Sequence, residues 1–264
     1  MCAVASVCLL NIPIPDAKRN QKPPVSVTIS IIGAGRLGTA LAVALADKSY
    51  SIQSLVARTV ASARKAAKLL DPFDDVQVLA AKNLGSLRPA DLFLITTPDD
   101  QIAHVASELA RLENVRRPTA LHTSGALSAD VLVPLRKRDW TTGSIHPLIS
   151  VSGSTTPLDG AFWSVEGDKT ALRVGKTIVR DLGGKSFSIR SEDKPLYHAA
   201  AMMSAGNVVA LFDVALEMLV QCGLSRKTAR SILLPLLAST VHNLETKDTP
   251  AALTGTFARG DIET

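Results

Sequence analysis

Residues 27–41 read VTISIIGAGRLGTAL, and this stretch decides the fold. A β-branched run from Val27 to Ile32 stops at the glycine-rich sequence GAGRLG, and an apolar helical pattern follows at once and continues to about Asp47. The pattern predicts a strand, a tight turn and a helix, and unpaired N–H groups and the helix dipole favour an anion at such a helix N-terminus. We therefore expect this turn to bind the pyrophosphate of a dinucleotide.

Each glycine of the turn has a separate expected role. Gly33 makes the tight turn, Gly35 lets the backbone approach the pyrophosphate, and Gly38 lets the helix pack closely on the strand. The expected contacts with the cofactor come from the whole turn, which comprises Gly33, Ala34, Gly35, Arg36, Leu37 and Gly38.

Composition narrows the class of protein. The 264 residues are 46% hydrophobic but only 4% aromatic, which is typical of α/β proteins whose parallel strands are buried under Ala, Val and Leu. The net charge of +5 comes without a basic stripe interleaved with aromatic residues, so we expect no nucleic-acid partner. Cys2, Cys8 and Cys222 are too scattered for a disulfide framework or a metal site, which predicts a cytoplasmic protein without a bound metal.

The first residues do not resemble an anchor. Residues 1–10 are apolar but short and lack a preceding basic region, and residues 11–24 are rich in proline and lysine. We expect residues 1–24 to form a flexible leader, and we expect no later stretch to be long and apolar enough to enter a membrane.

The rest of the chain divides near residue 190. Alternating strands and helices predict a doubly wound sheet in a domain of residues 25–190, and residues 191–264 have only helical periodicity, which predicts a smaller all-helical domain. Further strands are expected at residues 52–57, 76–79, 91–96, 119–121, 143–145, 162–166 and 185–189. Helices are expected at residues 101–111, with a cap from Asp99 or Asp100, and at 170–182, 194–222 and 225–245, the last of them interrupted by Pro235.

The end of the second strand indicates which dinucleotide binds. An NAD site normally has an acidic residue there, about 20 residues after the glycines, to bind the ribose 2′-hydroxyl. This chain has Arg58, followed by Thr59 and Ser62. These side chains suit a 2′-phosphate, so we expect NADP.

Polar residues follow three neighbouring strands at the carboxyl edge of the predicted sheet, where cofactor and substrate meet in open α/β folds. Thr97 and Pro98 follow the fourth strand, and we expect them to contact the cofactor. His122 and Ser124 follow the fifth strand and His146 follows the sixth. Because a histidine titrates near neutrality, we expect His146 to be the catalytic acid, with His122 second and Ser124 holding the substrate. A structural role remains open for each histidine.

The long helix after residue 193 presents further polar groups. Tyr197, Ser204 and Asn207 recur at spacings that place them on one face. We expect Ser204 and Asn207 to hold the substrate and Tyr197 to be another candidate acid, although this face could also be a buried polar seam. His198 lies about 100° around the helix from Tyr197 and is a weaker candidate.

The chain resembles bacterial Rossmann-like oxidoreductases that carry a C-terminal domain of unknown function, number 2520. The matching stretches are IIGAGRLGTAL, ITTPDDQIAHVA, LHTSGAL, GSIHPLIS, EDKPLYHAAAMMSAGN and ALTGTFARGD. That family is similar to pyrroline-5-carboxylate reductase and to the β-hydroxyacid dehydrogenases. The resemblance implies a Rossmann-type sheet, NADP, and a helical domain that forms a homodimer.

Two features depart from this pattern. Many β-hydroxyacid dehydrogenases have a catalytic lysine one helical turn before an asparagine, and here the residue one turn before Asn207 is Met203. The resemblance also implies another helix after Asp261, whereas the sequence ends at Thr264.

These features together predict an NADP-dependent oxidoreductase that acts on a small carbonyl or imine between the two domains. Two alternatives remain open. The protein could be a regulator that binds NADPH without turnover, which the missing lysine favours, or a reductase that uses a deazaflavin.

Overall fold

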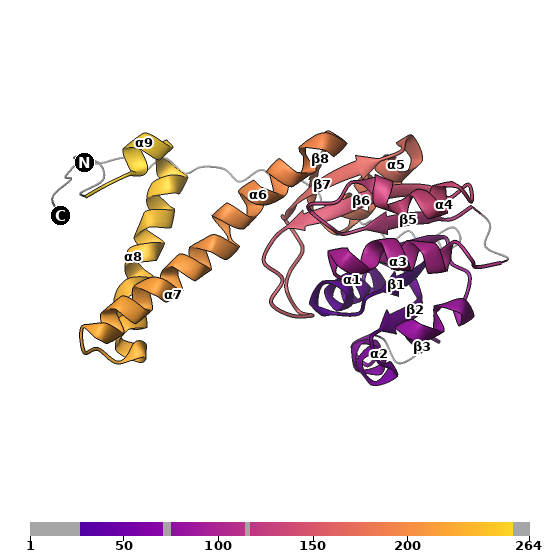
Figure 1. Ribbon diagram of the computed structural model, residues 1–264, viewed down its shortest axis with the longest axis horizontal. Coiled ribbons are helices and arrows are strands. Elements are labelled where there is room, and N and C mark those ends of the chain that lie inside the picture. The colour runs from indigo at the N-terminus through magenta and orange to yellow at the C-terminus, as the bar shows by residue number, and fades with distance from the viewer. Residues whose placement is uncertain (1–26, 71–74, 114–116, 256–264) are drawn as a thin grey trace, which may run out of the picture.

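The computed structural model describes residues 27–70, 75–113 and 117–255. The expected leader and the end of the chain after residue 255 lie outside these ranges. A single sheet with strand order β3-β2-β1-β4-β5-β6-β7-β8 forms the first part of the molecule (Figure 1). The strands are β1 (Thr28–Ile32), β2 (Ser51–Ala57), β3 (Gln77–Ala80), β4 (Leu92–Ile95), β5 (Thr119–His122), β6 (Thr141–Leu148), β7 (Phe162–Gly167) and β8 (Lys185–Phe187). All neighbouring strands are parallel except β6 and β7, so the expected α/β class and doubly wound sheet are confirmed.

The helices separate into those that cover the sheet and those that leave it. The first group comprises α1 (Arg36–Ala46), α2 (Val60–Ala67), α3 (Asp99–Leu109), α4 (Val133–Arg136) and α5 (Lys169–Asp181), with the short 3-10 helices η1 (Ala81–Ser86) and η2 (Ala129–Leu132). The second group comprises η3 (Ser191–Asp193), α6 (Lys194–Ser204), α7 (Gly206–Gln221), α8 (Arg226–Thr246) and α9 (Thr249–Ala252).

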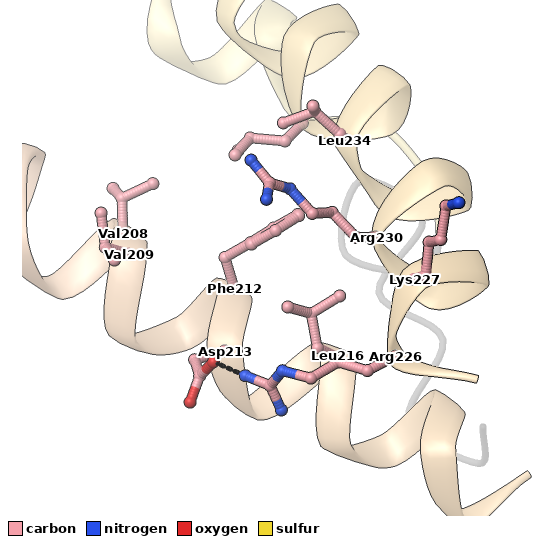
Figure 2. A pocket seen from close by; sticks show the side chains of 10 residues that line it. Val208, Val209, Phe212, Asp213, Leu216, Arg226, Lys227, Arg230 and Leu234 are labelled. Atoms are coloured by element: carbon pink, nitrogen blue, oxygen red, sulfur yellow. Dashed lines mark hydrogen bonds and ion pairs between the residues drawn. The ribbon is translucent and has the colours of Figure 1, made fainter. Parts of the chain in front are cut away.

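Helices α6 to α9, residues 194–252, form an arm that projects from the sheet, and α8 folds back beside α7 (Figure 1). Arg226 at the start of α8 pairs with Asp213 and Glu217 of α7. A groove of about 660 Å³ lies between the two helices, and Figure 2 shows Phe212 and Leu216 pointing across it toward α8.

The arm has almost no core of its own. Its buried residues among those described are Lys194, Leu216, Ala229 and Ala252. Large apolar side chains such as Leu211 and Val209 are each 70% exposed. By length and composition, Ser191–Gln221 could cross a membrane, with a mean hydropathy of 1.6. The expectation that no stretch after the leader is long and apolar enough for this is therefore wrong.

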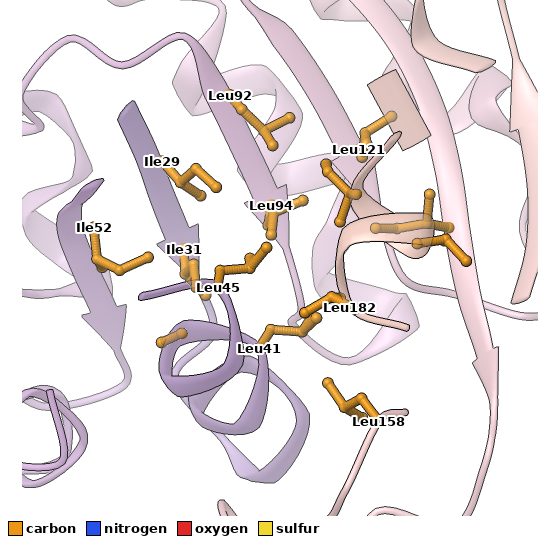
Figure 3. Close-up of a cluster of buried hydrophobic side chains, with 14 of the residues drawn as sticks. Ile29, Ile31, Leu41, Leu45, Ile52, Leu92, Leu94, Leu121, Leu158 and Leu182 are labelled. Carbon is orange, nitrogen blue, oxygen red and sulfur yellow. The ribbon is translucent and has the colours of Figure 1, made fainter. Parts of the chain in front are cut away.

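The core of the sheet has two layers. On one face, Leu41 and Leu45 of α1 pack with Ile29 and Leu94 of the central strands, as Figure 3 shows, and Ile178 of α5 belongs to the same cluster. On the other face, a second cluster contains buried side chains of α3 and η2. Because helices cover both faces, the central parallel strands β1, β4 and β5 bury nearly all of their side chains.

Several elements differ from the sequence expectations. Strand β6 extends over His146 and Pro147, because the antiparallel partner β7 continues the ladder to Leu148. The expected helix 194–222 is divided at Ala205, whose φ of −126° and ψ of −77° are not helical. In contrast, α8 runs through Pro235 as one helix. Pro98 occupies the N-cap position of α3 without a side-chain hydrogen bond, and the expected caps Asp99 and Asp100 lie in the first turn of the helix.

Candidate dinucleotide site and histidine cluster

The glycine turn has the geometry that the sequence pattern predicts. Gly33 has φ +110°, and a Cβ there would lie 2.6 Å from the carbonyl carbon of Thr96. A Cβ on Gly38 would lie 2.3 Å from the carbonyl oxygen of Gly33. Gly35 differs, because its Cβ would meet nothing closer than 3.9 Å. The protein therefore needs glycine at positions 33 and 38 for its own packing, whereas Gly35 leaves open space at the start of α1.

Strand β4 supports this turn from the neighbouring position in the sheet. The hydroxyl of Thr96 donates to the carbonyl of Gly33 at 2.7 Å. The adjacent Thr97 Oγ1 is buried and has no hydrogen-bond partner among the described residues. An unpaired buried hydroxyl costs free energy unless a ligand or water satisfies it. Thr97 at this edge therefore fits a polar group of a bound cofactor.

Arg58 lies at the end of β2 and is exposed. The residues described include no ion-pair partner for its guanidinium. Next to it, Thr59 caps α2 by accepting a hydrogen bond from the backbone N–H of Ser62 at 3.2 Å, and the two hydroxyls lie 3.0 Å apart. The two hydroxyls therefore lie at the start of α2, which directly follows Arg58 in the chain.

His122 is fully buried and both of its ring nitrogens are bonded to backbone. Nε2 lies 3.2 Å from the carbonyl of Ser128, which only accepts, and the backbone N–H of Ser124 donates to Nδ1 at 3.2 Å. These partners assign the proton to Nε2. Burial, with a further contribution from Lys194, lowers the pKa of His122 to about 3. Both ring nitrogens of His122 are therefore occupied in this structure, which favours the structural role left open for it over the role of a catalytic acid.

The hydroxyl of Ser124 likewise makes all of its hydrogen bonds within the protein. It donates to Asp99 at 2.8 Å and accepts from the backbone N–H groups of Ala126 and Leu127. These bonds fix the turn after β5. Because a hydroxyl has one hydrogen to donate and two lone pairs to accept with, these three bonds leave the Ser124 hydroxyl no capacity for the expected contact with substrate.

His146 contacts helix α6. Its Nδ1 lies 2.7 Å from the hydroxyl of Tyr197, and its ring stands perpendicular to the Tyr197 ring. The ring of His198 lies 5.8 Å from that of His146. A Cβ on Gly125 would lie 2.5 Å from His198 Nδ1 and 2.8 Å from His146 Nε2. The two imidazoles therefore converge at Gly125, and His198 belongs to the cluster despite its position around the helix from Tyr197.

The electrostatics of this cluster favour a neutral His146 ring. Burial, with contributions from the positive charge of Lys194 and from His198, lowers the pKa of His146 to about 4. Burial raises the pKa of Tyr197 above its ordinary value. At neutral pH, His146 is therefore uncharged and Tyr197 keeps its proton.

Lys194 is the residue that sequence reasoning missed. It is fully buried, and its ammonium donates to the carbonyl of Ser124 at 2.9 Å and to the hydroxyl of Ser144 at 2.6 Å. Burial lowers its pKa to about 8, against the opposing effect of Glu166 and Asp99. A signal was available in the sequence, because Lys194 lies three and four residues before Tyr197 and His198 and so shares their helix face.

Ser204 and Asn207 do not join this cluster. Both are exposed on the arm, where the hydroxyl of Ser204 donates to the carbonyl of Ala200 at 3.0 Å and the amide of Asn207 donates to Met203 Sδ. They lie two to three helical turns after Tyr197, too far along the arm to face the same ligand within one chain.

The fold and the candidate site define a class: an open, mostly parallel α/β sheet with a glycine-rich turn at its carboxyl edge and an imidazole–phenol pair beside it. The chain belongs to the Rossmann-like domain family, whose sequence model matches residues 12–147. Residues 161–264 match a domain of unknown function, DUF2520. That second match begins before β7, so it includes the last two strands of the sheet as well as the arm.

Solved structures share this architecture. A protein assigned as an NADP oxidoreductase from Bacteroides fragilis has a TM-score of 0.75 at 23% identity, covering 89% of this chain and 87% of that one. A protein from Thermotoga maritima has a TM-score of 0.68 at 25% identity, covering 88% and 85%. A 1-pyrroline-5-carboxylate reductase from Streptococcus pyogenes has a TM-score of 0.62 at 16% identity, covering 90% and 86%.

These likenesses confirm the resemblance that the sequence motifs indicated. The chain has a fold that it shares with nicotinamide-dependent oxidoreductases. No curated protein matches the chain significantly.

Proposed function

We propose that this protein is a cytoplasmic NADP-dependent oxidoreductase that reduces a small carbonyl or imine at the carboxyl edge of the sheet, beside the first turns of α6. One observation carries the proposal: the His146–Tyr197 hydrogen bond of 2.7 Å lies next to the carboxyl edge that also holds the glycine turn. The descriptions of the Bacteroides fragilis and Streptococcus pyogenes proteins, which name NADP and reduction of a pyrroline, support it.

The residues around the edge fit NADP. The open backbone at Gly35 and the N-terminus of α1 would hold the pyrophosphate, together with the other residues of the turn, Gly33, Ala34, Arg36, Leu37 and Gly38. Arg58, Thr59 and Ser62 would hold the 2′-phosphate, because a guanidinium with two hydroxyls supplies charge-assisted hydrogen bonds. Thr97 and Pro98 would contact the part of the cofactor above β4, where Thr97 Oγ1 gains a partner.

When bound, NADPH supplies a hydride, and the chain must supply a proton to the substrate oxygen or nitrogen. Tyr197 keeps its proton and donates it to Nδ1 of His146, which leaves the neutral ring with its proton on Nε2. His146 Nε2–H is then the donor to substrate. As that proton transfers, Nδ1 takes the phenolic proton of Tyr197, which leaves a phenolate that solvent reprotonates.

This mechanism changes the role first expected of His146. An imidazolium is scarce at neutral pH because the pKa of His146 is about 4. A neutral imidazole that relays the proton of Tyr197 avoids this problem, since an alkoxide or amide anion is a stronger base than a phenolate. His122 and Ser124 hold the backbone around Gly125, so their role in this proposal is structural.

We also propose that the protein is a homodimer joined through the arm. The groove between α7 and α8 is lined mainly by apolar side chains, including Phe212, Leu216 and Leu234 (Figure 2). A second copy offers the same apolar surface, so two arms can bury each other as an isologous pair. In such a dimer the exposed Ser204 and Asn207 become available to the partner's site, which keeps them as candidates for holding substrate.

A membrane is the less suitable partner for the arm. Helix α8 has Arg226, Lys227 and Arg230 in its first turns, and Arg226 pairs with Asp213 and Glu217 near the turn of the α7–α8 hairpin. Charged side chains on a hairpin are costly inside a bilayer, whereas an interface between proteins tolerates them at its rim.

The experiment is incubation of the purified protein with NADPH and a panel of 2-ketoacids, cyclic imines and aldehydes, with loss of nicotinamide absorbance as the readout. Turnover of one class supports the proposal and names the substrate class. Tight NADPH binding without turnover of any compound would support a non-catalytic regulator. Turnover only with a reduced deazaflavin would replace NADP in the proposal.

A further inference from the structure

We propose that Lys194 is a positioning residue of the site: its buried ammonium joins the start of α6 to the turn after β5 and to β6, and so holds Tyr197 and His198 against His146. The inference deepens the proposed function and rests on His146 being the proton donor.

Lys194 connects three segments of the protein. It is the first residue of α6, its Nζ bonds to the carbonyl of Ser124 in the turn after β5, and it bonds to the hydroxyl of Ser144 in β6. Ser144 lies two residues before His146 on the same strand. Tyr197 follows Lys194 by one turn of α6. The bonds of Lys194 therefore set the separation between the strand that holds His146 and the helix that holds its partner.

The turn after β5 depends on the same anchor. Gly125 packs against His146 and His198 so closely that a Cβ would lie within 2.8 Å of His146 Nε2. The carbonyl that precedes Gly125 is the one that accepts from Lys194. Loss of the ammonium would release this carbonyl and let the turn move away from both imidazoles.

The charge of Lys194 also acts on His146. The titratable groups that act on His146 or lie against it are Lys194, Tyr197 and His198 of α6 and His122 of β5. Of these, Lys194 and His198 disfavour the protonated form of His146. Removal of a nearby positive charge stabilises an imidazolium, so the pKa of His146 must rise when the lysine is neutral.

The groups that act on Lys194 itself are two carboxylates. Glu166 of β7 and Asp99 of α3 favour its charged form, although no described carboxylate lies within ion-pair distance of Nζ. The pKa of Lys194 of about 8 means that its charge is present below that pH and is lost above it.

The first test is Lys194→Met, which keeps the length of the side chain and removes the charge and both hydrogen bonds. The readout is the pKa of His146, followed by NMR of the imidazole in the protein without cofactor or substrate. We expect a rise of about one pH unit, since one unit charge at this range has an effect of that order. Lys185→Met, at an exposed lysine above the Phe162 ring, is the matched control and should leave the titration unchanged.

The second test uses the unaltered protein and so does not depend on folding of a variant. As pH rises through about 8, the side-chain resonances of Lys194 should titrate, and the His146 ring resonances should shift with the same midpoint. An unchanged pKa of His146 in folded Lys194→Met would overturn the proposal. A His146 ring that does not respond while Lys194 titrates would also overturn it.

Both readouts are independent of turnover. If His146 responds to Lys194 but no carbonyl or imine is reduced, the proposed function fails and the role of Lys194 in organising the cluster stands. If turnover is found but His146 does not respond, only the inference about Lys194 fails.

Discussion

Arg58 stands exposed at the end of β2, without an ion-pair partner among the described residues. A charge-assisted bond to a 2′-phosphate is worth about 1.5–3 kcal/mol, so NADPH should bind about ten- to a hundredfold more tightly than NADH. Arg58→Ala should remove most of this preference while NADH affinity changes little. Thermal shifts with each cofactor at matched concentration measure it, because stabilisation follows the ratio of ligand concentration to Kd.

Arg64→Ala on the following helix, α2, is the matched control, since it removes an exposed arginine that lies away from the strand end. Equal shifts for NADPH and NADH in the unaltered protein would refute the role of Arg58.

His146 is the residue on which the proposed chemistry depends. His146→Ala removes the Nε2 donor and the acceptor for Tyr197, and should lower kcat by about 10²- to 10⁴-fold with NADPH affinity nearly intact. Steady-state kinetics with the substrate that the panel identifies, together with NADPH titration, measure the two effects separately. His104→Ala, at an exposed histidine of α3, should keep the full rate. A His146→Ala variant with unaltered kcat would make His146 structural.

At the scale of elements, two glycines of the turn have different expected roles, since Gly38 matters for stability and Gly35 for binding of NADPH. A Cβ on Gly38 would lie 2.3 Å from the Gly33 carbonyl, so Gly38→Ala must displace α1 from β1 and lower the free energy of unfolding by about 1–3 kcal/mol. Gly35→Ala meets no atom within 3.9 Å and should leave stability nearly unchanged. It should nevertheless weaken NADPH binding by at least about tenfold, because the pyrophosphate needs that space.

Urea unfolding and NADPH titration of the two variants test this difference. A Gly35→Ala protein that binds NADPH as tightly as the unaltered protein would place the cofactor elsewhere.

At the scale of the whole molecule, the exposed arm predicts self-association. Val209 lies in the groove between α7 and α8 and is 70% exposed, so Val209→Glu places a charge in the proposed interface. Light scattering at micromolar concentration should give a dimer for the unaltered protein and a monomer for the variant. Leu69→Glu, a change of the same kind at an exposed residue just after α2, should remain dimeric.

A monomer in the unaltered protein would contradict the dimer. If the monomer also binds anionic or neutral phospholipid vesicles through the arm, the apolar helix Ser191–Gln221 serves a membrane instead.

The fold was predictable because its signals are local. The run from Val27 to Ile32, the glycine turn and the helix after it are contiguous, and β-branched and helical periodicities show strand and helix directly. The expected preference for NADP also follows from a local signal, because it depends on a single residue, Arg58, at the end of a strand where the adenosine ribose is expected to bind. It stays a prediction until binding is measured.

The arrangement of the candidate site depends on contacts that no local sequence pattern contains. Only the tertiary structure shows that the ring nitrogens of His122 are both bonded to backbone, and that Lys194 lies buried among residues 50 and 70 positions away. Only tertiary structure brings His198 to His146, and leaves Ser204 and Asn207 exposed. The sequence by itself determined the order of strands and helices and the position of the glycine turn, because hydrophobic periodicity and backbone conformation act over a few residues. The partners of each polar side chain were decided by the folded sheet and α6, because burial and hydrogen bonding act across segments far apart in the chain.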